Sequence, residues 1–148
     1  MKAVIQRVEE ASVTIAGQVT ASIGQGYLVL LGAAMVDDTD TVKKVAKKMI
    51  DLRIFQDDQG KTNLSIEDVG GEILVVSQFT LLADCRKGRR PSFIKAGDPA
   101  EAEKLYLEFI EECKKRVETV RHGDFGADMK VQLVNDGPFT IVLDSEEL

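Results

Sequence analysis

A polar segment follows a strongly apolar run in the middle of the chain. Residues 73–76 are apolar and mostly β-branched, which predicts a buried strand, and Ser77, Gln78 and Thr80 come directly after it. A strand end is a common place for binding residues, because the strand fixes their position and the following loop admits a ligand. The simpler interpretation is that these side chains only satisfy backbone groups where the sheet ends.

Hydrolytic chemistry at this segment could take two forms. If Thr80 were a nucleophile it would need a base, and His122 is the only histidine of the chain. Backbone amides and hydroxyl groups could instead stabilise an oxyanion, which requires no titrating side chain. The sequence leaves open a conventional Ser or Thr esterase and a hydrolase whose base comes from outside the chain.

A second segment, residues 135–140, centres on Gly137-Pro138. The sequence Asn135-Asp136-Gly137 predicts a tight turn between two strands, at about 129–134 and 139–143. One interpretation is an ordinary trans hairpin loop. The other is a cis peptide bond before Pro138, which would hold the neighbouring carbonyls in a fixed direction.

A basic loop is predicted at residues 84–97. Its cations Arg86, Lys87, Arg89 and Arg90 begin a few residues after Thr80, and arginine can bind phosphate oxygens in a forked geometry. The loop is therefore the best candidate in the chain for binding tRNA or another RNA. A solvated surface loop is the alternative.

The hydrophobic pattern predicts a single α+β domain over residues 1–148. Apolar residues repeat with helical period after Asp38 or Thr39, and Asp98-Pro99 reads as the N-cap and first turn of a second helix. Strands are expected at residues 3–8, in a hairpin around Gly17-Gln18, and at 27–31, 52–55 and 72–80, followed by the two closing strands.

Composition excludes several classes of protein. A net charge of −6 argues against nonspecific coating of nucleic acid, and the longest apolar run is too short to span a bilayer. Two cysteines without an export signal favour free thiols in a cytoplasmic protein, with Cys113 in the core. One histidine without a Cys/His cluster predicts neither a metal site nor a cofactor.

Five segments in order and spacing resemble the D-aminoacyl-tRNA deacylase family. They are residues 1–8, 77–81, 89–93, 125–129 and 135–140, so that the resemblance covers the whole chain. The combination of Ser77-Gln78-Phe79-Thr80-Leu81 with Asn135-Asp136-Gly137-Pro138-Phe139-Thr140 is its most specific part.

The resemblance implies a homodimeric hydrolase with barrel-like sheets, two main helices and active sites at the subunit interface. It would cleave the ester of D-aminoacyl-tRNA and of mischarged glycyl-tRNA. Gly137-Pro138 of the other subunit, braced by Arg7, would reject L-amino acids. The implied catalytic residues are Ser77, Gln78 and Thr80, and the implied substrate-binding residues are Phe79, Met129, Arg7, Gly137 and Pro138. A noncatalytic RNA-binding adaptor that uses only the basic loop is the competing hypothesis.

Overall fold

The computed structural model describes residues 1–148 and confirms a single-domain α+β fold. Its elements are β1 (Lys2–Ile15), β2 (Gln18–Ile23), β3 (Gly26–Gly32), α1 (Thr39–Asp51), β4 (Phe55–Gln56), β5 (Thr62–Leu64), β6 (Glu72–Ser77), the 3₁₀ turn η1 (Phe79–Leu82), α2 (Pro99–Lys114), β7 (Val120–His122), β8 (Lys130–Asp144) and the 3₁₀ turn η2 (Ser145–Glu147).

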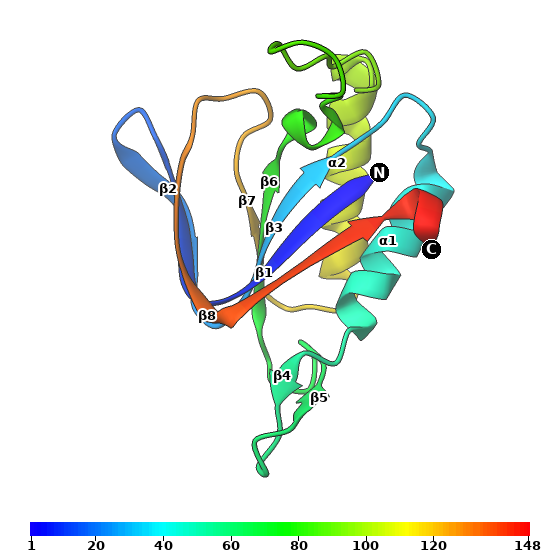
Figure 1. The fold of residues 1–148 in the computed structure, drawn as a ribbon. Helices are drawn as coiled ribbons and strands as arrows, with labels where there is room; N and C mark the ends of the chain where they lie inside the picture. Colours follow the sequence, from blue (N-terminus) through cyan, green and yellow to red (C-terminus); the bar gives the residue numbers. More distant parts are fainter.

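One six-stranded sheet carries the fold, with β1 as its longest interior strand (Figure 1). On one edge β1 pairs with β2 and β3, and on the other it pairs with β8 along almost its whole length, always antiparallel. Beyond β3 the direction changes, because β6 runs parallel to β3 and β7 runs parallel to β6. The sheet curls into a nearly closed barrel, with β4 and β5 forming a separate hairpin.

The buried strands contribute side chains to two separate cores, as their period of two requires. In β6, Ile73 and Val75 join the larger core beneath the helices, whereas Leu74 and Val76 point into the barrel. The same alternation explains why residues 73–76 are continuously apolar, since both faces of this strand are covered.

Both helices lie on the same side of the sheet (Figure 1) and cover the larger core. Asp38 caps α1, because its carboxylate accepts from the Thr41 amide at 2.9 Å, and Asp98 caps α2 in front of Pro99. The predicted starts of both helices are thus confirmed. Neither helix has the combination of length and apolar character that crossing a membrane requires.

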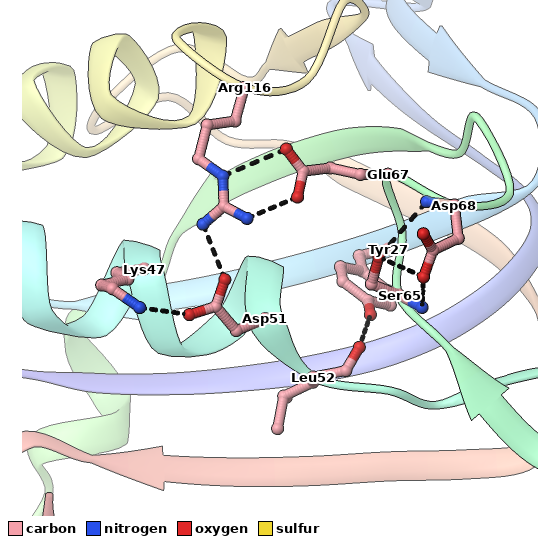
Figure 2. Close-up of polar contacts among 8 residues, drawn as sticks. All are labelled: Tyr27, Lys47, Asp51, Leu52, Ser65, Glu67, Asp68 and Arg116. Carbon is pink, nitrogen blue, oxygen red and sulfur yellow. Dashed lines mark hydrogen bonds and ion pairs between the residues drawn. The ribbon is translucent and has the colours of Figure 1, made fainter.

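An ion-pair cluster ties the ends of the two helices to the β5–β6 connection (Figure 2). Arg116, which follows α2, donates to Asp51 at the end of α1 at 2.7 Å and also to Glu67. These two carboxylates raise the pKa of the Arg116 guanidinium above its usual range. The cluster is partly solvated, so it fixes the relative placement of these segments more than it adds to stability.

Three predicted elements differ from the structure. The strand expected at 52–55 is only Phe55–Gln56, since Leu52 already caps α1. The strand expected at 72–80 ends at Ser77, and the chain then turns into η1. The two closing strands with a hairpin turn at Gly137-Pro138 are also wrong, because β8 is one strand that continues through this segment beside β1.

The two cysteines differ sharply in their surroundings, which gives a direct test of the core. Cys113 lies on the buried face of α2, and burial raises the pKa of its thiol to about 12, whereas Cys85 is exposed in the basic loop. Since the thiolate is the reactive form, we expect one thiol per chain to react with a disulfide reagent in the native protein at neutral pH and two in denaturant. Two fast-reacting thiols in the native protein would contradict this packing.

Candidate active site

The principal candidate site is a cavity of about 620 Å³ beyond the ends of three neighbouring strands. Because β3, β6 and β7 are parallel, their carboxyl ends meet at one edge of the sheet, where open α/β sheets usually bind ligands. The end of each strand and the chain after it supply one wall: Leu31 and Ala33 at the end of β3, residues 77–79 at the end of β6 and residues 125–129 after β7. The cavity thus combines two of the segments that the sequence singled out.

Ser77, Gln78, Phe79 and Met129 all line this cavity, as the prediction of a shared site requires. Thr80 lies just outside the lining, on the exposed side of η1. Its hydroxyl accepts a hydrogen bond from the Gln78 side-chain amide, and this is its single hydrogen bond in the chain. An amide group cannot accept the proton of a nucleophile, so the structure provides no base for Thr80.

The 3₁₀ turn is held against the end of β3 by backbone contacts. The Gln78 amide donates to the Leu31 carbonyl at 2.7 Å, and the Leu81 amide donates back to the Gln78 carbonyl at 3.3 Å. Gly32 makes this close approach possible, because a Cβ atom there would lie 2.8 Å from the Gln78 carbonyl oxygen. The absence of a side chain at Gly32 therefore allows η1 to hold Gln78 and Phe79 in the lining of the cavity.

Tyr106 of α2 connects two walls of the cavity. Its hydroxyl lies 2.8 Å from the Gly123 carbonyl oxygen and 3.0 Å from that of Val75, near the ends of β7 and β6. Burial, with a smaller contribution from the Asp124 carboxylate, raises the pKa of Tyr106, so the phenol remains a donor. Its ring also packs at 5.8 Å from Phe125, which anchors the wall at 125–129.

Gly137-Pro138 forms an exposed bulge on β8, and its peptide bond is cis. Pairing with β1 is regular up to Val134, shifts register before Asn135 and shifts again before Thr140, so residues 136–139 stand opposite Arg7 alone. The Asn135 side chain closes the bulge, since its Oδ1 accepts from the Phe139 amide at 2.6 Å. The trans hairpin interpretation is wrong for this segment, and the cis interpretation is confirmed.

Arg7 supports the bulge from below. Its side chain is only 6% exposed, and it donates to the Asp136 carbonyl at 2.9 Å and to the Ile54 carbonyl at 2.5 Å. The guanidinium also lies 4.6 Å from the centre of the Phe139 ring. Within one chain, however, none of Arg7, Gly137 and Pro138 lines the cavity.

The basic loop is organised by a short antiparallel bridge between Asp84 and Ser92, with backbone bonds of 2.8 and 2.9 Å. Arg86 folds back onto Asp84, and its guanidinium holds the pKa of that carboxylate well below the usual range. Lys87, Arg89 and Arg90 are exposed and form no ion pair. Three of the four predicted phosphate-binding cations are thus free, whereas Arg86 is already paired.

Sequence reasoning missed several residues that shape the site. Tyr106 lay on the apolar side of a helix, and Gly32 ended an apolar strand, so neither pattern distinguished a structural role from a functional one. Asn135 and Phe93 belong to segments that the sequence did single out, although their contacts could not be foreseen. The contacts of all four residues join segments that lie apart in the sequence or depend on a local bulge, which a sequence pattern does not show.

Comparisons with known proteins agree with this geometry. The sequence model of the family described as D-Tyr-tRNA(Tyr) deacylase matches residues 4–144. A protein of Thermosipho africanus named D-aminoacyl-tRNA deacylase is 52% identical over 148 residues, covering 100% of this chain and 99% of its own. A Clostridium novyi protein of the same name is 49% identical over 147 residues, covering 99% of both chains.

Two solved structures share the fold. One, titled c-Myc DNA Unwinding Element Binding Protein, superposes with a TM-score of 0.92 at 44% identity over 97% of this chain and 98% of that chain. The other, titled as a structural analysis of a probable eukaryotic D-amino acid tRNA deacylase, gives a TM-score of 0.84 at 16% identity over 96% of this chain and 97% of that one. The family match and the full-length relatives at about half identity decide the assignment: the chain belongs to the D-Tyr-tRNA(Tyr) deacylase family and is a hydrolase of D-aminoacyl-tRNA.

Proposed function

We propose that the cavity at the ends of β3, β6 and β7 receives the aminoacyl end of tRNA and that the enzyme hydrolyses esters of D-amino acids and of glycine. The observation that carries this proposal is the convergence of residues 77–79 and residues 125–129 on one cavity of about 620 Å³. These are two of the segments that resemble the deacylase family. Water adds to the ester carbonyl, the bond to the ribose oxygen breaks, and that oxygen takes up a proton as the free amino acid leaves.

The proposed chiral filter is Gly137-Pro138 of a second subunit. This dipeptide is exposed and lies outside the cavity of its own chain, so it is free to enter a neighbour. The bulge stands on β8, an edge strand that also exposes Val134 and Val142. A strand with one free edge and exposed apolar residues favours burial against another chain, which supports a homodimer with sites at its interface.

Rejection of L-amino acids then follows from backbone geometry. A pocket wall made of backbone atoms cannot adjust to an extra side chain, so the wrong enantiomer meets a steric clash. Glycine has no side chain to be rejected, and its ester is therefore hydrolysed as well. Free cations Lys87, Arg89 and Arg90 supply phosphate contacts for the tRNA, with Arg86 ordering the loop. Charged tRNA is a cytoplasmic substrate, so we place the enzyme in the cytoplasm.

The proposed chemistry relies on the RNA itself. Thr80 has no base within the chain, and the 2′-hydroxyl of the terminal ribose can help to orient or activate the attacking water. The first amides of a helical turn have no partner within it, and in η1 these belong to Phe79 and Thr80. Such amides can stabilise the developing oxyanion.

Thr80→Ala separates this mechanism from a hydroxyl nucleophile. We expect kcat to fall by less than about tenfold, because the variant loses one hydrogen bond and no reacting atom. Loss of an obligatory nucleophile typically lowers kcat by about 10⁴-fold or more. Single-turnover hydrolysis of D-tyrosyl-tRNA measures the difference, with circular dichroism to verify folding. A folded Thr80→Ala protein without activity would restore the nucleophile mechanism.

The function itself is tested by incubating the enzyme with D-tyrosyl-tRNA, L-tyrosyl-tRNA and glycyl-tRNA. The D-tyrosyl and glycyl esters should be hydrolysed at catalytic enzyme concentrations while the L-tyrosyl ester persists. Survival of all three esters at high enzyme concentration would favour the competing hypothesis of a noncatalytic RNA-binding adaptor. Equal hydrolysis of both tyrosyl esters would contradict the proposed chiral filter but not the proposed hydrolase activity.

A further inference from the structure

A pair of exposed aromatic rings stands at the rim of the cavity. Phe79 and Phe93 pack edge to face, with ring centroids 5.0 Å apart and planes at 67°. Phe79 is 56% exposed and Phe93 is 37% exposed, although both also line the cavity. Contact between the rings holds each in place. The exposed surfaces of Phe79 and Phe93 therefore form a fixed apolar surface, called the step below, at the edge of the cavity.

Free cations adjoin this step along the chain. Arg89 and Arg90 precede Phe93 in the basic loop, and Lys95 follows it. None of the three forms an ion pair, and the bridge between Asp84 and Ser92 anchors the chain directly before Phe93. In a protein with a net charge of −6, the segment from Arg89 to Lys95 that contains Phe93 carries three unpaired positive charges and no acidic residue.

Exposed aromatic side chains combined with free cations are the usual means by which proteins bind single-stranded nucleic acid, because every base can stack on a ring while its phosphate meets a cation. Building on the function proposed above, we propose that the ring of Phe93, which Phe79 supports edge to face, stacks on the base that precedes the terminal nucleotide of tRNA. Arg89 and Arg90 contact the adjoining phosphates. The terminal nucleotide with its amino acid occupies the cavity, and the next base rests on the rim.

A second copy of the chain is a less suitable occupant of this surface. In the dimer proposed above, the segment of the second copy that reaches the cavity is the exposed bulge Gly137-Pro138, which offers no phosphate to Lys87, Arg89 and Arg90. An RNA strand instead supplies phosphates to these cations and a base to the rings.

The test compares two substrates that share the amino acid and the terminal nucleoside: D-tyrosyl-tRNA and D-tyrosyl-adenosine. Only the tRNA has a preceding base. Phe93→Ala should raise KM for D-tyrosyl-tRNA about tenfold more than it raises KM for D-tyrosyl-adenosine, since stacking of one base is worth about 1–3 kcal/mol. Phe93→Tyr keeps an aromatic ring and should restore the KM for tRNA. Ile94→Ala removes a neighbouring side chain that is 83% exposed and should not change the ratio of the two KM values.

Each remaining outcome contradicts either the stacking proposal or the proposed function on which it rests. Equal increases of KM for both substrates would show that Phe93 contacts only the part of the substrate that occupies the cavity. No increase for either substrate would show that Phe93 does not contact the RNA. A change in oligomeric state of Phe93→Ala would show that a second copy covers the rings. Absence of wild-type activity on both substrates would overturn the proposed function itself, and with it this deeper inference.

Discussion

Gly32→Ala should lower the rate of D-aminoacyl-tRNA hydrolysis about 100-fold while the protein remains folded, since a displacement of about 1 Å at a catalytic group can cost this much. A Cβ atom at position 32 would lie 2.8 Å from the Gln78 carbonyl oxygen and 3.4 Å from Leu81 Cβ. The neighbour is backbone, so it can yield only if η1 moves. Movement of η1 shifts Gln78 and Phe79, which line the cavity.

The matched control is Gly24→Ala. Gly24 lies in the connection between β2 and β3, where a Cβ atom would meet only the Glu72 carboxylate at 3.9 Å. Neither glycine requires a left-handed backbone, so both substitutions test contact alone. Single-turnover rates should separate the two variants, and their urea midpoints should differ far less. Normal activity of Gly32→Ala would show that η1 does not need its present position.

Arg7→Ala should reduce both stability and chiral discrimination. Removing the guanidinium leaves the buried carbonyl of Ile54 without its partner, at a cost of about 1–3 kcal/mol, and removes the partly buried bond to the Asp136 carbonyl as well. The bulge at residues 136–139 also loses the side chain that stands opposite it. We expect a lower free energy of unfolding in urea and a smaller ratio of D-tyrosyl to L-tyrosyl hydrolysis.

Arg7→Lys is the informative companion variant. Lysine retains a positive charge, but its compact ammonium cannot reproduce the fork that joins Ile54 to Asp136. Stability should recover in part, whereas discrimination between the two tyrosyl esters should remain impaired. If Arg7→Lys discriminated like the wild type, charge near Gly137-Pro138 would matter and the forked brace would not.

Local pattern was enough to predict much of the fold. Helical period and the two Asp caps located α1 and α2, and continuous apolar residues located β3 and β6. These features depend on neighbours within a few residues. The bulge on β8 could not be predicted in this way, because Asn135-Asp136-Gly137 has the composition of a turn and only pairing with β1 on both sides shows that the strand continues.

The candidate site, like the fold, was predictable from sequence only where it depends on local pattern. Polar residues after a buried strand identified residues 77–80, but the pattern could not show that the chain leaves the strand at Ser77 and turns into η1. That turn depends on Gly32, which contacts it from another strand. The parallel order of β3, β6 and β7 is likewise a long-range property, and it is what brings Met129 beside Ser77.

An active site shared by two subunits is most directly tested by complementation between two defective chains. Met129→Arg blocks the cavity, and Gly137→Ala disturbs the bulge, since a Cβ atom there would lie 3.0 Å from the Phe139 amide nitrogen at a backbone φ of +144°. The Met129→Arg homodimer should be inactive because its cavity is blocked, and the Gly137→Ala homodimer because Gly137-Pro138 no longer completes the substrate-binding wall. A mixed dimer isolated through two different tags should recover about half of the wild-type turnover, because one of its two symmetry-related sites combines an intact cavity with an intact Gly137-Pro138. A mixed dimer as inactive as its parents would contradict the shared site.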